Sequence, residues 1–193
     1  MSQIQQPSCF TTTYPGIVNQ LVTDIHVCYP IINGNVIPGP GNDPNTFFPT
    51  KAIWDTGATN TTITRRAAEA LGLQPIGKGN VTGVNSTSVE NVHLAGLILP
   101  NGVRFSALRV TECESLSHPN DPIQCDVLLG MDVISHGDLA ISNLAGQTVL
   151  SFRMPSLERT DYVQDVNNGV PILPPGANRQ MRRQAAKKKK RRR

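Results

Sequence analysis

Short stretches of alternating apolar and polar residues, separated by turn-forming residues, recur along most of this chain and predict strands. Residues 17–28 set Leu21, Ile25 and Val27 against polar neighbours, which predicts a first strand. Prolines and glycines are spread through residues 29–49 and predict a long loop. Two short strands are then expected at residues 51–55 and 61–63, with a turn between them.

The rest of the chain follows the same pattern, with one helix inserted. Thr64 has the chemistry of a helix cap, alanines and Leu71 follow it, and Gly72 is expected to end the helix. Pro100-Asn101-Gly102 is typical of a hairpin turn. The expected elements are a strand-like region at 81–99 with a turn near residues 83–86, a strand at 103–111, a buried strand at 126–130, one helical turn at 131–135, and a last hairpin formed by 139–142 and 148–152.

These elements predict an all-β fold, a closed barrel or sandwich with one or two short helices. Residues 16–154 are expected to form its single domain, preceded by a flexible segment at residues 1–15. After Pro155 the pattern fades. Residues 155–178 are interpreted as a linker that contains proline and glycine, and residues 179–193 as a disordered basic tail.

Charge is divided unevenly between the domain and the tail. The net charge of the chain is +4, but ten of its 18 basic residues lie in residues 179–193, so the rest of the chain is acidic. A hydrophobic content of 38% suffices for a core, and no apolar stretch approaches the roughly 18 residues that a membrane-spanning helix needs. Residues 1–10 lack the features of a secretion signal, which predicts a cytoplasmic protein.

The four cysteines and four histidines form no recognised catalytic or metal-binding pattern. Without a secretion signal, the cysteines are expected to be reduced thiols. Cys113, His118 and Cys125 fall in one loop and could be read as part of a metal site, but their spacing matches no standard zinc pattern. We therefore expect neither a metal nor a cofactor.

One carboxylate stands out because of its position. The stretch Ala52-Ile53-Trp54 leads directly into Asp55-Thr56-Gly57-Ala58-Thr59, so a charged side chain follows an apolar strand. A carboxylate there is costly unless it is hydrogen-bonded or functional. Gly57 permits a sharp bend, and the hydroxyls of Thr56 and Thr59 can hold the turn. The same residues could also form an ordinary Asp-x-Gly turn with no chemical role.

The surroundings of this turn resemble a known family. Some 70 residues after it comes the block Leu128-Leu129-Gly130-Met131-Asp132, and a hairpin of suitable length to cover the turn lies between the two. In these features, over roughly residues 16–154, the chain resembles the retropepsin-like (retroviral-type) aspartic proteases, in particular their single-domain cellular and bacterial branch.

The resemblance implies an aspartic endopeptidase without a cofactor. It implies that Asp55 is catalytic, that Thr56, Gly57, Ala58 and Thr59 support the active-site loop, and that Leu128, Leu129 and Gly130 form a strand that braces it. Gly83, Val84, Asn85, Ser86 and Thr87 would form the tip of a flap over the substrate, although this tip is not rich in glycine as in viral members. Because each chain has one such aspartate turn, the resemblance also implies a homodimer that acts on peptides or proteins.

Two other interpretations remain open at this stage. One is a catalytically silent protease-fold dimer that binds peptides or acts as a nucleic-acid-associated scaffold. The other is a nucleic-acid-associated protein whose basic tail carries the main function. Independently of this, the tail at Lys187–Arg193 would attract polyanions without sequence specificity, either nucleic acid or an anionic membrane surface. Asp132 could be a second acidic participant, but its position favours a cap of the helical turn beside it.

Overall fold

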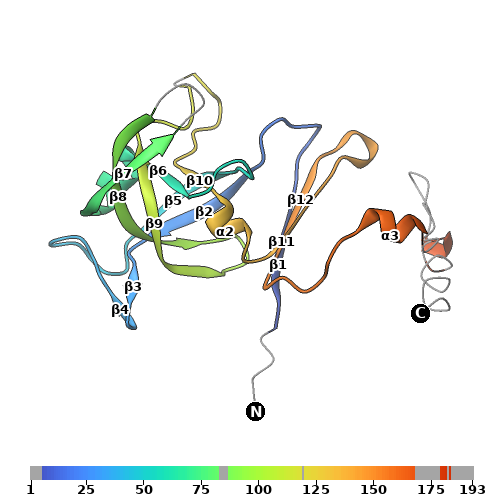
Figure 1. Cartoon of the computed structure of the whole chain (residues 1–193), viewed down its shortest axis with the longest axis horizontal. Helices are drawn as coiled ribbons and strands as arrows, with labels where there is room; N and C mark the ends of the chain where they lie inside the picture. The colour runs from blue at the N-terminus through green and yellow to red at the C-terminus, as the bar shows by residue number, and fades with distance from the viewer. Residues whose placement is uncertain (1–5, 83–86, 119, 168–178, 182, 184–193) are drawn as a thin grey trace, which may run out of the picture.

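Most strands of this chain belong to two β-sheets that stand side by side, a small antiparallel sheet and a large mixed one (Figure 1). The structure is a computed structural model and describes residues 6–82, 87–118, 120–167, 179–181 and 183. A two-stranded ribbon formed by β3 (Ile31–Ile32) and β4 (Asn35–Val36) completes the strands. The expected all-β class is therefore confirmed. No helix among the described residues is long and apolar enough to cross a membrane.

The large sheet has seven strands and carries most of the core. Its order is β2 (Val22–Cys28), β5 (Phe47–Trp54), β10 (Val127–Leu129), β6 (Thr62–Thr64), β9 (Arg104–Cys113), β8 (Thr87–Ile98) and β7 (Pro75–Thr82). β2 also pairs with β8, so that the pairings from β2 to β8 form a closed ring and β7 extends beyond it. The side chains inside this ring include Ile25, Val27, Ile63, Leu97, Val110 and Leu129, all at most 2% exposed.

Helix α1 (Arg65–Leu71) begins and ends where its sequence predicts. The hydroxyl of Thr64 accepts a hydrogen bond from the amide of Ala67, and Gly72 adopts the left-handed conformation with φ +61°. Ala67, Ala68 and Leu71 are buried against the large sheet. A second helix, α2 (Met131–Ile134), forms the single turn that was expected after β10.

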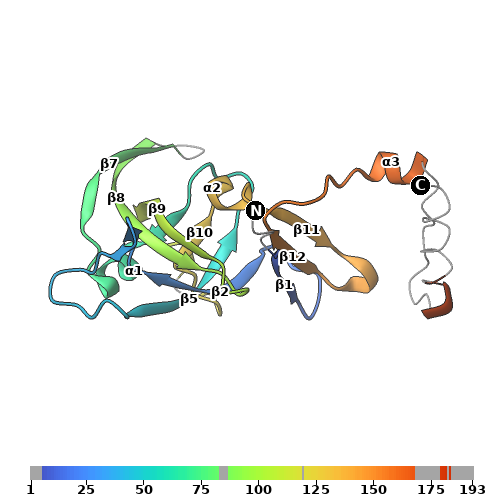
Figure 2. The same ribbon diagram turned by 90° about the horizontal axis from the view of Figure 1, so that it is seen from below.

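The small sheet packs on the strand that leads to Asp55. It consists of β1 (Ser8–Thr13), β12 (Val149–Met154) and β11 (Asp138–Ser142), with a short 3-10 turn η1 (Leu144–Gly146) between β11 and β12 (Figure 2). The ring of Trp54 lies 5.0 Å from that of Phe152 and 6.0 Å from that of Phe10, measured between centroids. These aromatic contacts join the two sheets directly behind the aspartate turn.

The structure differs from the sequence-based expectations at several places. Residues 29–49, expected to be a long loop, contain β3, β4 and the start of β5, because residues 47–49 pair with β2 and the two short strands pair with each other. Residues 8–13, expected to be part of a flexible segment, form β1 because they complete the small sheet through pairing with β12. β7 begins at Pro75, earlier than expected, and most of its side chains are exposed, so it lacks the alternation that marks a half-buried strand. Helix α3 (Tyr162–Asn167) lies within the expected linker and buries no side chain.

Candidate active site

Asp55 follows the last residue of β5 and is held there by the neighbouring strand. β10 runs parallel to β5, with Leu129 opposite Trp54. The amide of Asp55 donates to the carbonyl of Leu129 at 3.0 Å, and the amide of Trp54 donates to Leu21 at 2.9 Å. These bonds fix the backbone on both sides of the point where the strand ends. The Asp55 side chain is half-buried, so it can meet both the protein and an outside group.

The turn itself holds one oxygen of the Asp55 carboxylate. The amide of Gly57 donates to Oδ1 at 2.8 Å, and the amide of Ala58 donates to the Asp55 carbonyl at 3.3 Å. A Cβ atom on Gly57 would lie 3.2 Å from the same Oδ1, which explains why a glycine suits this position. Thr56, Gly57 and Thr59 are exposed and Ala58 is half-buried. The turn therefore presents the carboxylate together with exposed backbone and hydroxyl groups.

The predicted brace lies directly against the aspartate loop. β10 lies between β5 and β6, so Leu128 pairs with both Ile53 and Thr62. Beyond the strand, the amide of Met131 donates to Ala58 at 2.8 Å. Gly130 lies flat against the loop, because a Cβ atom there would come within 2.6 Å of the carbonyl carbon of Asn60. The bracing role of Leu128, Leu129 and Gly130 stays a prediction, but their position is suited to it.

Asp132 does not cap helix α2, in contrast to the interpretation from sequence. It lies inside the helix, and its carboxylate reaches across to the end of the aspartate loop. There Oδ2 accepts from the amide of Thr61 at 2.9 Å and Oδ1 accepts from its hydroxyl at 2.7 Å. Nothing in the local sequence identifies Thr61 as this partner, since 70 intervening residues separate the two.

Asp126 is a second carboxylate that the sequence did not single out. Its side chain is only 2% exposed and accepts hydrogen bonds from the hydroxyls of Thr50 and Thr64, both at 2.6 Å, and from the Arg66 guanidinium. Burial alone would raise the pKa of this carboxyl group, but the hydrogen bonds outweigh it and lower the pKa. Asp126 thus links β5, β6 and α1 beside the aspartate loop. In the sequence, the one feature that could have indicated a buried carboxylate here is that Asp126 directly precedes an apolar strand.

A similar buried pair lies farther along the sheet. His93 Nε2 lies 3.0 Å from Glu112 Oε2, and the guanidinium of Arg65 donates to the other oxygen at 3.1 Å. Burial would raise the pKa of Glu112, but hydrogen bonds from His93, Arg65 and Asn91 lower it. These contacts tie α1 to β8 and β9 and leave Glu112 fully occupied as a structural group.

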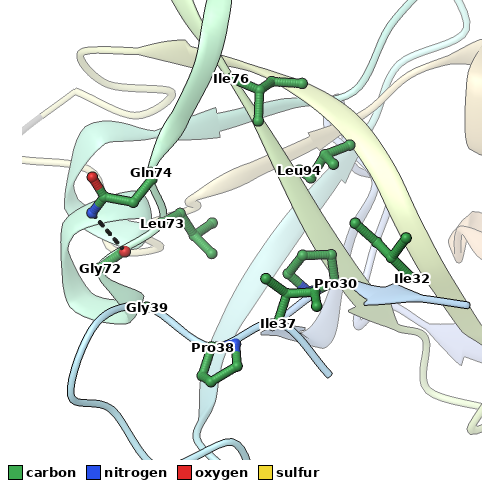
Figure 3. A pocket seen from close by; sticks show the side chains of 10 residues that line it. All are labelled: Pro30, Ile32, Ile37, Pro38, Gly39, Gly72, Leu73, Gln74, Ile76 and Leu94. Carbon is green, nitrogen blue, oxygen red and sulfur yellow. Dashed lines mark hydrogen bonds between the residues drawn. The ribbon is translucent and has the colours of Figure 1, made fainter. Parts of the chain in front are cut away.

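One of the five residues predicted to form the flap tip, Thr87, lies on the β7–β8 hairpin, and the flap itself stays a prediction. Thr82 pairs with Thr87, the exposed first residue of β8, at the outer end of the hairpin. The other four predicted tip residues, 83–86, lie outside the described residues. At the opposite end of the hairpin, Ile76 and Leu94 line an apolar pocket together with Ile37 and Leu73 (Figure 3). Asp55 does not line this pocket, so we do not assign the reaction to it.

Comparison with known proteins supports the resemblance. Residues 45–136, just under half of the chain, match the model of the family described as gag-polyprotein putative aspartyl protease. This segment contains both the Asp55 turn and the β10–α2 block. No curated protein matches the chain. The resemblance to retropepsin-like aspartic proteases that the sequence predicts is thereby confirmed.

Three solved structures illustrate how distant the similar proteins are. A retropepsin-like aspartic protease from Rickettsia conorii is 13% identical, with 78% of this chain and 98% of that chain covered and a TM-score of 0.42. The retroviral protease-like domain of Ddi1 from Leishmania major is 19% identical, with coverages of 75% and 99% and a TM-score of 0.38. The Simian Foamy Virus (mac) protease is 16% identical, with coverages of 60% and 92% and a TM-score of 0.35.

Proposed function

Because residues 45–136 match an aspartyl protease family, we propose that the chain is an aspartic endopeptidase in which Asp55 acts together with the partner subunit's Asp55. The observation that carries the proposal is the setting of this carboxylate. It is half-buried, bound by the Gly57 amide, and presented by a loop that the backbone of residues 129–132 holds. A carboxylate placed in this way is fixed in direction and still reachable.

The proposed site needs two copies of the chain. Asp-Thr-Gly occurs once in the sequence, whereas acid–base chemistry on a peptide bond requires one group to accept a proton while another donates one. A two-fold axis beside Asp55 would supply both groups from identical loops. Thr56, which is exposed at the turn, would then contact the partner's loop across the axis.

The mechanism follows from the repulsion of two like charges. Carboxylates about 3 Å apart cannot both be ionised, so the pair shares one proton. The ionised carboxylate takes a proton from water while the oxygen of that water attacks the peptide carbonyl carbon. The protonated carboxyl group gives its proton to the carbonyl oxygen. The carboxyl group that took the proton from water then gives it to the nitrogen, while the other carboxylate takes a proton back from a hydroxyl of the diol intermediate. The C–N bond breaks, an amine and a carboxylic acid leave, and the pair again holds one proton.

The substrate class proposed is an extended peptide or unfolded protein segment. Such a segment would lie between the aspartate pair and the β7–β8 hairpin, with hydrogen bonds of the kind that join β-strands. Alternate side chains would point into pockets on opposite sides. Residues 83–87 are proposed as the part of the hairpin that covers it.

The test is cleavage of an unstructured protein between about pH 3 and 7, the range in which such carboxyl pairs titrate. Asp55→Asn is expected to abolish cleavage while the protein stays folded, since the amide has nearly the shape of the carboxyl group. Asp24→Asn is the matched control, because the Asp24 side chain is 83% exposed and its ion pair, among the residues that the structure describes, is with Lys51. A folded wild type without cleavage that depends on Asp55 would refute the proposal and favour a catalytically silent scaffold.

Subunit exchange tests the shared site separately. If wild type and Asp55→Asn protomers mix freely in equal amounts, only about a quarter of the dimers contain two wild-type chains. Activity per dimer should fall accordingly, and light scattering should report dimers. A strictly monomeric active enzyme would contradict the model.

We propose no role in hydrolysis for the basic tail. Ten basic residues in the last 15 of the chain would attract polyanions through counterion release, with affinity falling steeply as salt rises. Removal of residues 179–193 should therefore leave peptide cleavage unchanged and weaken polyanion binding. Loss of cleavage on truncation would show that the tail belongs to the enzymatic machinery.

A further inference from the structure

We propose that Asp132 is a positioning residue for the cleavage reaction, acting through Thr61 on the loop that carries Asp55. This inference rests on the proposed function. Each carboxylate oxygen of Asp132 accepts a hydrogen bond from Thr61, so the proposed role runs through Thr61 and not through contact with the substrate.

Two hydrogen bonds join Asp132 to Thr61, and the Thr61 end of the contact is fully buried. Thr61 is 0% exposed, and both its amide and its hydroxyl donate to the same carboxylate, at 2.9 and 2.7 Å. The Thr61 oxygen in turn accepts from the amide of Gly130 at 3.2 Å. The hydroxyl therefore uses its one proton toward Asp132 and a lone pair toward the β10–α2 turn. A carboxylate that accepts two bonds from one residue fixes the direction of that residue as well as its distance.

The same short segment holds both ends of the aspartate loop. Leu129 accepts the amide of Asp55 at the loop's beginning, and the amide of Asp132 donates to Thr59 at 3.1 Å near its end. Between these points the amide of Met131 donates to Ala58. All of these are backbone bonds. At the loop's end the carbonyl of Thr61 accepts from the amide of Thr111 at 3.2 Å, and the Asp132 carboxylate adds the side-chain contact that ties Thr61 to α2.

The chemistry makes small displacements of the loop costly. The shared proton requires the two Asp55 carboxyl groups to stay at short range, and misplacement of a reacting group by about 1 Å can lower a rate roughly 10²-fold. In a symmetric dimer any shift of one loop is repeated in the other, so a displacement of Asp55 moves both carboxyl groups of the pair. Loss of the Asp132–Thr61 contact is therefore expected to reduce turnover before it unfolds the domain.

The test compares Thr61→Val and Thr61→Ser in the full-length chain. Valine keeps the shape but removes the hydroxyl, and serine restores it. We expect Thr61→Val to lose roughly tenfold to 10²-fold in kcat, with KM nearly unchanged and the dimer intact, and Thr61→Ser to recover most of the loss. Asp132→Asn, which retains one acceptor oxygen, should fall between wild type and Thr61→Val.

The pH profile separates positioning from a purely structural role. The pH range over which a carboxylate pair holds a single shared proton is set by the repulsion between its two charges, and this repulsion weakens with distance. A plot of kcat/KM against pH falls off on an acid limb and a basic limb. In Thr61→Val the pH values at which these two limbs fall off should move closer together. A change in stability alone would scale activity without moving the limbs.

Thr50→Val provides the matched control. It also deletes a threonine hydroxyl that donates to a largely buried aspartate, here Asp126 at 2.6 Å, without touching the aspartate loop. It should lower stability and leave the pH limbs in place. Unchanged kcat and limbs in both Thr61→Val and Asp132→Asn, or equal effects in Thr50→Val, would overturn the positioning role while leaving the proposed function standing. An inactive folded wild type would overturn both.

Discussion

Asp126 should be among the most sensitive positions of the domain. Its carboxylate is 2% exposed and receives hydrogen bonds from Thr50 on β5, Thr64 at the start of α1, and two nitrogens of Arg66. The backbone of Asp126 continues the sheet on both sides, with its amide bonded to Lys51 and its carbonyl to Thr64. Asp126→Ala keeps these backbone bonds and removes only the group on which three side chains converge.

The magnitude follows from which partners can reach water afterwards. Removing one member of a buried ion pair costs about 3–5 kcal/mol when the other charge stays buried. Arg66 is 64% exposed in its side chain, so its charge can be solvated and the cost falls toward the lower limit. Thr64 is buried and Thr50 half-buried, and each unpaired hydroxyl adds about 1 kcal/mol or more. We expect a loss of about 3 kcal/mol in the free energy of unfolding.

Urea unfolding at a fixed protomer concentration measures this loss. The chain has one tryptophan, and Trp54 is 5% exposed, so its fluorescence reports the unfolding of the core. With a slope of about 2 kcal/mol per molar urea, the midpoint should fall by roughly 1.5 M. Asp24→Ala, which removes an exposed carboxylate, should change the free energy by no more than about 0.5 kcal/mol.

The pH dependence supplies the refuting result. Because the folded-state pKa of Asp126 is lowered, its contribution is complete above the unfolded value of about 3.9 and disappears as the pH falls through the folded-state pKa. The difference between wild type and Asp126→Ala should therefore be full at neutral pH and shrink in strong acid. A midpoint shift no larger than that of Asp24→Ala, or one that stays constant down to about pH 2, would refute the reasoning.

Three further outcomes are expected. Gly130→Ala should destabilise by about 1–3 kcal/mol in the same urea assay, because its Cβ would meet the Asn60 backbone at 2.6 Å, and normal stability would contradict this. The melting temperature of Asp55→Asn, used to avoid self-cleavage, should fall below about pH 4.5, since Glu112 and Asp126 have lowered pKa values; a flat profile would exclude their contribution. Cys113 should react slowly with iodoacetamide at neutral pH, because burial and nearby carboxylates raise its pKa to about 11; rapid labelling of the folded protein at Cys113 would be inconsistent with it.

Elements with strong local chemistry could be predicted from the sequence. The Thr64 cap and Gly72 end of α1 occur where expected, as does the hairpin through Asn101 and Gly102. These features depend on a few consecutive residues whose backbone preferences and hydrogen bonds are local. β1 and β7 lack such features. β1 takes its place through pairing with β12, and β7 has both faces largely exposed, so neither carries a clear pattern of its own.

The candidate site divides in the same way. The Asp55 turn and the Leu128-Leu129-Gly130 block are recognisable along the chain, because each is a run of neighbouring residues with unusual chemistry. The partners of Asp126 and Asp132 are not, because Thr50, Thr61 and Thr64 lie 60 or more residues away.

The sequence by itself therefore determined the protease resemblance, the residue proposed to be catalytic and the all-β class. The tertiary structure alone decided which strands flank that residue and which carboxylate, that of Asp132, contacts the end of its loop. The physical reason is the pairing of β10 between β5 and β6. A hydrogen-bonded ladder between distant strands fixes which side chains meet, and no local preference encodes that choice.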